Sequence, residues 1–274
     1  MTVMTKIVPS ATAARPQRQS PSVRRSRPLV DVDVEVALDA VLDDPRALFR
    51  LKLLRSTRRL LAERGLDVSM DDIAEAAGVN RRTLFRHVQS RDALVAETLT
   101  SAMDWYDTQI ERVVPVDRPL LGWITDLATQ LMEIHRAAGR GLWQLAATPD
   151  DDLAPELVVV NRRRRADRKA SVAVSADSIW QRGGGTGPCP VVIVDAVAVC
   201  FSSFMTRSMV EDFGRPVGPL AESVGTMLAA LVEVQVAAQV AAQVAAKKGD
   251  RGGAPAPRSR QAPTRSTRGS APVR

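Results

Sequence analysis

The amino-acid sequence predicts an all-α fold in which a small three-helix module precedes a larger helical domain. Three observations lead to this prediction. Apolar residues recur at helical spacing from residue 45 onward. Cap residues and glycines divide the first part of that stretch into short helices. No strand pattern of consequence follows residue 40, and the valine–acid alternation at 30–36 has no partner strand nearby.

Charge and composition divide the chain into four parts. Residues 1–44 carry six bases and then six acids, and their first thirty residues are rich in Pro, Ser and Arg, so we expect a disordered segment. Residues 247–274 carry eight bases and one acid and are predicted to form a disordered tail. In between, residues 45–92 hold eleven bases against six acids, and residues 93–246 hold thirteen against eighteen. A small basic block beside a larger acidic block is typical of a nucleic-acid-binding module joined to a second domain.

The first helix of the module is predicted to begin at Asp44 and Pro45. An aspartate at the N-cap accepts from backbone N–H groups of the first turn, and proline at the first helical position lacks an N–H that would be unpaired anyway. Gly65 ends the helix. Four leucines recur along it at near-helical spacing: Leu48, Leu51, Leu54 and Leu61.

A sharp turn between two short helices comes next. Ser69 and Asp72 form a capping box that opens a helix over 70–77, and Gly78 stops that helix. Asn80 caps a third, very short helix. A helix-turn-helix requires this order, because the first helix braces the second, which places its N-terminal residues against base edges in the major groove.

Residues 68–94 read VSMDDIAEAAGVNRRTLFRHVQSRDAL. This stretch resembles the DNA-binding signature of the TetR/AcrR family of transcriptional regulators, which has Ile-Ala-x-x-Ala-Gly-Val, a small polar residue, Thr-Leu-aromatic-x-His-Phe and Ser-Lys-x-x-Leu. The resemblance implies a sequence-specific regulator, usually a homodimeric repressor that a small-molecule effector releases from its double-stranded DNA operator.

The resemblance also implies which residues contact DNA. The start of the third helix faces the groove, an aromatic residue rests on the backbone, and His87 and Arg91 match phosphate-contacting positions. The complete set is Ser69, Asn80, Arg81, Arg82, Thr83, Phe85, His87 and Arg91.

Two of these positions depart from the family pattern. Arg82 stands where the family often has glycine, and an arginine there could read guanine O6 and N7 through two hydrogen bonds. Phe85 stands where a tyrosine is usual and lacks the hydroxyl for one phosphate hydrogen bond. The alternative for Arg81 and Arg82 is solvated surface charge, and for His87 an exposed helix residue without a DNA contact.

The larger domain is predicted to be a run of longer helices. Ser90 caps the first of them, and the glycine-rich stretch 183–188 is a loop. The helix at 190–213 is apolar nearly all round, so it must be buried on more than one side. The resemblance implies that the last two helices of each subunit form a four-helix dimer interface. The later helices are placed at about 119–137, 140–147, 153–181, 190–213 and 217–246.

An effector pocket is expected among these helices, since such pockets are apolar with a few polar anchors. Each candidate residue, taken alone, is more often plain core. The acid excess of residues 93–246 favours an apolar or weakly cationic effector, although the basic run 162–165 leaves an anionic one open. That run, together with Arg168 and Lys169, is expected to be a solvated helix face or loop, and the alternatives are an anionic effector site or an added DNA contact. The candidate residues are Trp123, Leu127, Trp143, Trp180 and Phe201.

The composition argues against several other classes of protein. With two histidines and two cysteines in the chain, no catalytic set, metal site or cofactor site can be assembled, so we expect no enzyme, no metal and no cofactor. The first thirty residues lack an apolar signal core and no long charge-free apolar run follows, so a soluble, cytoplasmic protein without a membrane partner is expected. The alternative function is a less specific architectural DNA-binding protein without a small-molecule ligand, for which the two basic tails argue.

Overall fold

The computed structural model describes residues 44–252, with side chains up to Lys247. The predictions for residues 1–43 and 253–274, including the alternation at 30–36, lie outside the described residues. The boundary predicted at 246 is wrong, because residues 247–252, expected to begin a disordered tail, continue the last helix to Gly252. Contacts divide the chain into two units, Met1–Leu48 and Phe49–Arg274. Of the first unit only Asp44–Leu48 is described, and it forms the start of a helix.

The described residues form helices, turns and loops without a strand, which confirms the predicted all-α class. The small module comes first, and each short helix begins within one residue of its predicted start. Its helices are α2 (Pro45–Arg64), α3 (Met70–Ala77) and α4 (Arg81–His87).

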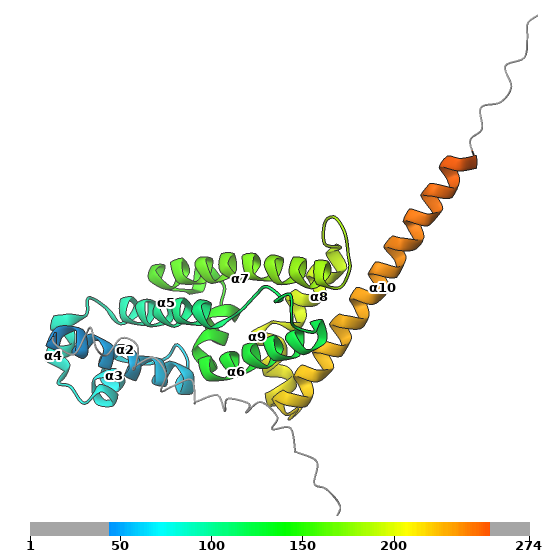
Figure 1. The fold of residues 1–274 in the computed structure, drawn as a ribbon. Helices are drawn as coiled ribbons and strands as arrows, with labels where there is room; N and C mark the ends of the chain where they lie inside the picture. Colours follow the sequence, from blue (N-terminus) through cyan, green and yellow to red (C-terminus); the bar gives the residue numbers. More distant parts are fainter. Residues whose placement is uncertain (1–43, 253–274) are drawn as a thin grey trace, which may run out of the picture. The chain divides into compact units, whose positions relative to one another are not determined.

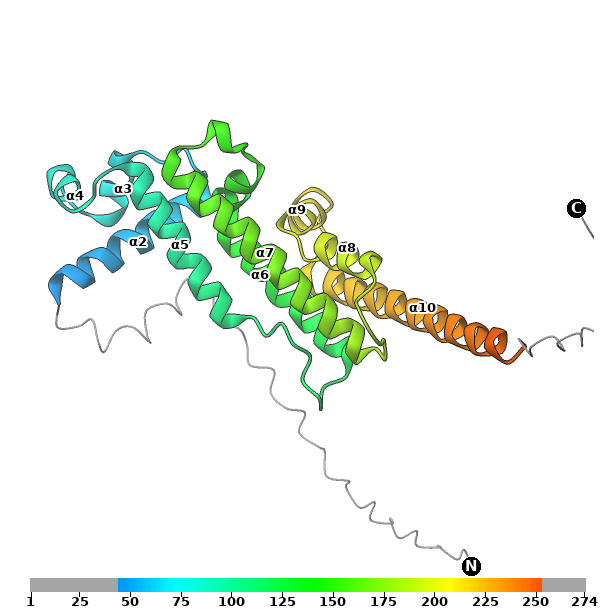
Figure 2. The ribbon, with the colours of Figure 1, turned by 90° about the horizontal axis from the view of Figure 1, so that it is seen from above.

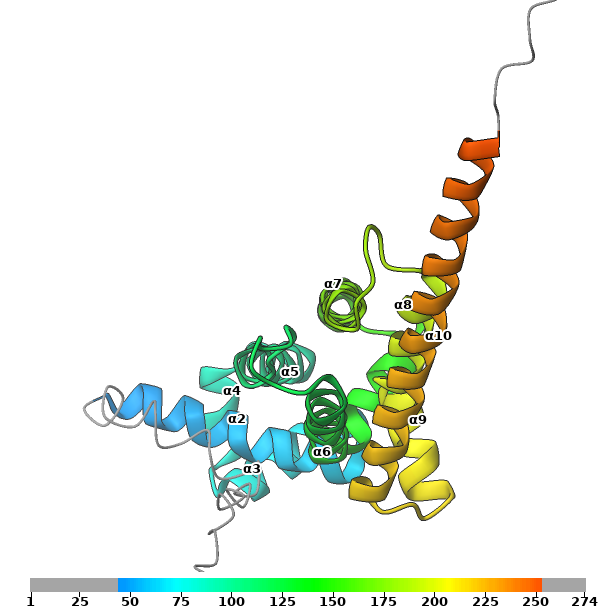
Figure 3. The ribbon, with the colours of Figure 1, turned by 45° about the vertical axis from the view of Figure 1, so that its right-hand side comes forward.

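The larger part of the chain follows, and α5, α6 and α7 run side by side in it (Figure 2; Figure 3 views them nearly end on). The long C-terminal helix α10 packs on α6 and α8 (Figure 1). A 3-10 turn at Asp150–Asp152 precedes α7, and a π-helical turn at Ser208–Asp212 follows α9. The helices are α5 (Arg91–Gln109), α6 (Leu120–Ala147), α7 (Pro155–Arg182), α8 (Val191–Cys200), α9 (Ser203–Arg207) and α10 (Val217–Gly252).

The core of the small module extends into the longer helices. Leu53, Ile73 and Leu84, one from each helix of the module, are completely buried. The same cluster takes in Leu145 near the end of α6 and Leu157 near the start of α7. Because each fully buried side chain of this size contributes about 1.5–3 kcal/mol, the module and the base of the larger domain stabilise each other.

A second core holds the rest of the larger domain together. Trp123, Ile179 and Leu228 bring α6, α7 and α10 into this cluster, and α8 adds Val197. Helices α6 and α7 therefore contribute to both cores: one end of each helix packs in the first core and the other end packs in the second.

A break inside α6 separates its contributions to the two cores. Gly139 has φ 61° and ψ −149°, a conformation that is essentially restricted to glycine. The break agrees with the predicted boundary between helices at 119–137 and 140–147. A Cβ on Gly139 would lie 2.6 Å from the Cα of Ala62 in α2, so only glycine allows the two helices to approach this closely.

The single helix predicted over 190–213 is wrong. The helix ends at Cys200, and Ser202 has extended backbone angles and caps α9 by accepting a hydrogen bond from the N–H of Met205 at 3.0 Å. Apolar periodicity concealed this N-cap serine. The expectation that the segment is buried on several sides also fails for the single chain, because Val191 and Val199 are 73% and 64% exposed.

Candidate nucleic-acid interface and ligand cavity

The turn between α3 and α4 is built from three local devices. Ser69 accepts from the backbone N–H of Asp72 at 3.1 Å, and Asp72 accepts in return from the N–H of Ser69 at 2.9 Å. Gly78 adopts φ 59° and ψ 44°, which lets the chain reverse directly after α3. Asn80 then accepts from the N–H of Arg82 at 2.8 Å and starts α4.

The start of α4 presents a polar surface to solvent. Asn80, Arg81 and Arg82 are exposed and Thr83 is partly buried, whereas Leu84 points into the core with no exposed surface. Phe85 is 47% exposed although it is aromatic. A short capped helix held by one buried leucine therefore displays side chains that can hydrogen-bond, carry positive charge or stack.

The two arginines at this helix start have different surroundings. Arg81 donates to a carboxylate oxygen of Asp71 in α3 at 2.7 Å, and its guanidinium carbon lies 5.4 Å from the centre of the Phe85 ring. In the part of the chain that the structure describes, the Arg82 side chain has neither a hydrogen-bond partner nor an ion-pair partner. Arg82 is thus the more available of the two for a partner outside the chain.

The end of α4 is tied to α2. The ring of His87 lies 4.6 Å from that of Phe49, and the His87 carbonyl accepts from a guanidinium nitrogen of Arg50 at 3.3 Å. Arg50 also pairs with Glu97 of α5. These contacts fix the direction of α4 while the His87 side chain stays exposed.

Arg91 lies in a partly buried position that sequence reasoning did not foresee. Its Nε donates to the carbonyl of Val68 at 2.7 Å, and a terminal nitrogen pairs with Asp92 at 2.5 Å. The guanidinium therefore joins the start of α5 to the segment before α3. Arg91 therefore supports the module, while 30% of its side chain remains exposed to solvent.

A cavity of about 170 Å³ lies between α5, α6 and α7, closed at one side by the junction of α8 and α9. Most of its lining is apolar. Leu127 and Phe201, two of the five residues expected to contact an effector, are part of that lining.

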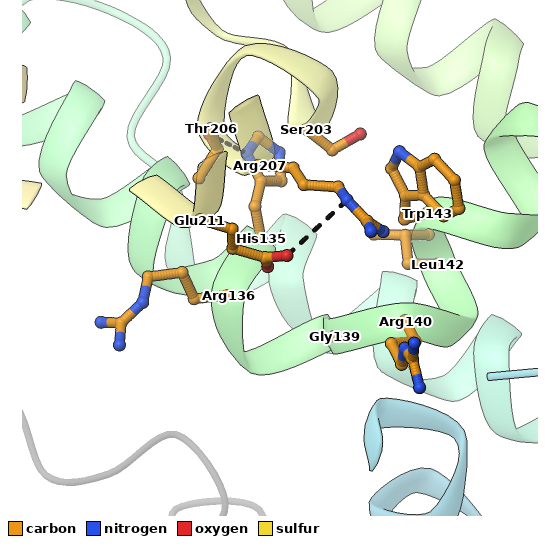
Figure 4. A pocket seen from close by; sticks show the side chains of 10 residues that line it. All are labelled: His135, Arg136, Gly139, Arg140, Leu142, Trp143, Ser203, Thr206, Arg207 and Glu211. Atoms are coloured by element: carbon orange, nitrogen blue, oxygen red, sulfur yellow. Dashed lines mark hydrogen bonds and ion pairs between the residues drawn. The ribbon is translucent and has the colours of Figure 1, made fainter. Parts of the chain in front are cut away.

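The three tryptophans expected at the pocket lie elsewhere. Trp123 and Trp180 are each 1% exposed and belong to the core, so the plain-core alternative describes them. Trp143 lines a smaller hollow of about 20 Å³ on the other side of His135 and Leu142, which both hollows share. The guanidinium of Arg207 stacks 3.8 Å from the Trp143 ring centre and pairs with Glu211 (Figure 4).

Sequence reasoning did not assign Arg164 and Arg168 to the cavity. They lie four residues apart, which places them on one face of α7, and both line the cavity. The signal available in the sequence was this spacing within the basic run. The other arginines of the run have carboxylate partners, since Arg162 and Arg165 pair with Asp150, and Arg163 with Asp104 and Asp167.

Asp150 is the carboxylate that pairs with Arg162 and Arg165, the arginines of the run on the outer face of α7. Hydrogen bonds and charge from Arg165, with further hydrogen bonds from Arg162 and Asn161, lower the pKa of Asp150 to about 2. Arg162 and Arg165 therefore share a carboxylate partner that stays ionised, whereas Arg164 and Arg168 on the inner face of α7 have no carboxylate partner in the described chain.

His135 lies at the boundary of the two hollows, with Nδ1 3.0 Å from the hydroxyl of Thr206 (Figure 4). Burial, and to a smaller extent the positive charge of Arg168, lowers the pKa of His135 from 6.5 to about 4. The imidazole is therefore neutral at physiological pH.

The pKa of His135 predicts how stability depends on pH. As pH falls below 6.5, His135 binds a proton in the unfolded chain before it does so in the folded chain. The contribution of the neutral, buried His135 to the stability of the fold is therefore complete above pH 6.5 and is lost as pH approaches 4. We expect the free energy of unfolding to fall by about 1.5 kcal/mol between pH 6.5 and pH 5 through this group. Urea unfolding at several pH values measures this fall.

Two variants isolate the contribution of His135 to that fall. His135→Gln should flatten the pH dependence over this window, whereas His87→Gln at the exposed histidine should leave it as in the unmodified chain. A His135→Gln variant with undiminished pH dependence would contradict the assignment.

No metal site is seen in the described part of the chain. Among residues 44–252, no three histidine, cysteine, aspartate or glutamate side chains lie close enough together to bind a metal ion.

Two comparisons with known proteins bear on this geometry. A family model described as "Bacterial regulatory proteins, tetR family" matches residues 53–98, which run from α2 through the turn into α5. The chain is also 31% identical to the HTH-type transcriptional repressor KstR2 of Mycolicibacterium smegmatis over 188 residues, covering 67% of this chain and 88% of the relative. The second similarity therefore extends well beyond the small module into the larger helical domain.

Proposed function

Since the chain belongs to the TetR family of bacterial regulatory proteins and is a DNA-binding transcriptional regulator, we propose that it acts as a homodimeric repressor which a small-molecule effector releases from its operator. Residues 45–92 are the DNA-binding part in this proposal, and residues 93–246 bind the effector and the second subunit. The relative's own name describes it as a transcriptional repressor, which favours repression over activation.

The exposed first turn of α4 is the observation that carries DNA recognition. Asn80, Arg81 and Arg82 stand free of the core on a helix whose N-terminus is capped and whose direction is held by Leu84 and Arg50. A rigid, exposed, basic helix start fits the major groove, where side chains from the first turn reach base edges. In this proposal His87, Arg91 and the Ser69 cap lie along the phosphates, and Phe85 rests on the backbone.

Exposed apolar side chains on α8 and α10 support a dimer. Val191, Val192 and Val199 of α8 and Met227 and Val234 of α10 are all at least 45% exposed in the single chain. Apolar residues gathered on two neighbouring helices are typical of a surface covered by a partner. In a two-fold symmetric dimer, α8 and α10 of each subunit cover the exposed apolar residues on α8 and α10 of the other, which forms the four-helix interface.

A membrane is the other environment that could cover α10. The stretch Val217–Lys247 is long and apolar enough to cross one, and an 18-residue window within it has mean hydropathy 1.6. However, α10 packs on α6 and α8, and its buried residues Leu220, Leu228 and Val232 form a stripe in the core. We assign the apolar surface to a second subunit, and the protein to the cytoplasm.

Helix α6 provides a route from the cavity to the DNA-binding module. His135 and Leu142 line the cavity on either side of the Gly139 break. Near the end of the same helix, the Gln144 side chain accepts from the N–H of Leu66, directly after α2, at 2.5 Å. A ligand that shifts α6 therefore moves a contact of the module, and a small change in the separation of two recognition helices weakens operator binding.

Selection of random duplexes by the full-length protein tests the proposed function. We expect enrichment of a two-fold symmetric site whose half-sites lie about one helical turn apart. Enrichment of bent or AT-rich DNA without a symmetric motif would favour the architectural alternative. In that case the affinity of the protein for the enriched DNA would depend on salt to the same degree as its affinity for random DNA.

Arg82→Ala is expected to weaken binding to the selected site by about 1–3 kcal/mol and to relax the preference at one base position. Arg81→Ala is the matched control, because Arg81 is already paired with Asp71. It should weaken binding to selected and scrambled duplexes alike. Fluorescence anisotropy with both duplexes measures the difference, and an equal loss on both for Arg82→Ala would make Arg82 a phosphate contact.

A further inference from the structure

The lining of the cavity holds more positively charged than negatively charged side chains. Asp107 pairs with Arg112 at 2.6 Å, and Asp167 pairs with Arg163, which lies outside the lining, at 3.3 Å. Each carboxylate of the lining is therefore occupied by an arginine. Arg164 and Arg168 remain as cations of the lining that have no carboxylate partner in the described chain.

These two arginines are held in place by neutral oxygen atoms. Arg164 donates from Nε to the side-chain oxygen of Asn161 at 3.0 Å, and Arg168 donates to the carbonyl of Ala198 at 2.5 Å. Asn161 is completely buried, so the Arg164 guanidinium is anchored from the protein interior. Such contacts use one nitrogen of each guanidinium and leave further N–H donors for an acceptor.

Burial makes this arrangement unfavourable without a counter-charge. Burial and the like charges of Arg168 and Arg165 lower the pKa of Arg164. Guanidiniums nevertheless remain protonated in proteins. An anion between Arg164 and Arg168 would relieve this repulsion and accept charge-assisted hydrogen bonds.

The remainder of the cavity is apolar and small. Ile110, Leu127, Leu131, Ile134, Val172 and Phe201 supply its aliphatic and aromatic walls. The neutral His135 adds no charge. The volume of about 170 Å³ is slightly larger than a cavity of about 150 Å³ that is able to hold benzene.

We propose that this cavity binds a compact, mostly hydrocarbon carboxylate, with the carboxylate between Arg164 and Arg168 and the hydrocarbon part against Leu127, Leu131 and Phe201. The net charge of residues 93–246, which favours an apolar or weakly cationic effector, does not describe this site because the carboxylates of the lining are already paired. The role of the ligand as effector rests on the proposed function, whereas its binding does not.

Calorimetric titration of the full-length protein tests the site. The probes are phenylalkanoates and straight-chain carboxylates of six to ten carbons, each matched by its neutral amide. We expect at least one carboxylate to bind about tenfold to a hundredfold more tightly than its amide. Arg164→Gln and Arg168→Gln should abolish that difference, and Arg164→Lys should preserve part of it because the charge remains.

Arg165→Gln is the control, since Arg165 pairs with Asp150 on the outer face of α7 and should leave carboxylate binding unchanged. Equal binding of carboxylates and amides, unchanged carboxylate affinity in both glutamine variants, or no saturable binding of any carboxylate at millimolar concentration would overturn the proposal. Thermal melting of each variant shows whether a loss of binding reflects unfolding.

A second measurement separates this inference from the proposed function. Operator affinity is measured with and without the tightest carboxylate. If that carboxylate binds but operator affinity does not change, the site stands and effector release fails. If neutral or cationic compounds release the operator while no carboxylate binds, the site assignment fails and the proposed function stands.

Discussion

Val199→Glu is expected to produce a folded monomer that binds the operator at least about 100-fold more weakly than the unmodified protein does. Val199 lies on α8 and is 64% exposed, so a glutamate is solvated in the isolated chain and leaves its fold intact. In a two-fold symmetric interface the substitution occurs twice and would bury two unpaired carboxylates. A monomer loses the gain from holding two linked recognition helices on one duplex.

Light scattering and anisotropy with the selected duplex measure both effects of this substitution. Val116→Glu is the matched control, because Val116 is 86% exposed and belongs to the segment between α5 and α6 rather than to α8 or α10. It should remain dimeric and bind DNA normally. A dimeric Val199→Glu variant with full operator affinity would place the interface elsewhere, and an unmodified protein that is monomeric would remove the basis for a dimer.

Gly139→Ala is expected to lower the free energy of unfolding by about 2–4 kcal/mol. The backbone at Gly139 is strained for any residue with a Cβ, and the new methyl would overlap the backbone of Ala62. Both effects act where α6 crosses α2, so the damage falls on the contact between the module and the larger domain. Urea unfolding monitored by circular dichroism gives the size of the effect.

Gly122→Ala provides the control within the same helix. A Cβ at Gly122 meets nothing within 4 Å, so alanine should raise stability by about 0.5–1 kcal/mol through helix propensity. A Gly139→Ala variant as stable as the unmodified chain would mean that α6 can straighten at this point without loss.

Local signals explain how much of the fold could be predicted. The capping box at Ser69, the left-handed Gly78 and the Asn80 cap act within a few residues, so α3 and α4 were predicted with nearly correct bounds. The same kind of signal was overlooked at Ser202, where a continuous apolar pattern hid the end of α8. Periodicity reports which face of a helix is apolar and does not show where the helix stops.

The cavity depends on contacts that sequence periodicity does not contain. Its lining comes from α5, α6, α7 and the junction of α8 and α9, and packing decides which apolar side chains border a space and which fill one. Trp123 and Trp180 therefore became core, whereas Leu127 and Phe201 border the cavity. Charge pairing was hidden for the same reason, since Asp104 and Asp150 neutralise arginines that lie far from them in the sequence.

The ratio of affinities for the selected operator and a scrambled duplex of equal length and composition, measured at physiological salt, tests sequence-specific recognition most directly. We expect a ratio of about a thousand or more, and a ratio that falls by roughly ten- to a hundredfold in Arg82→Ala. A ratio near one for the unmodified protein, with both affinities falling equally as salt rises, would contradict sequence-specific recognition.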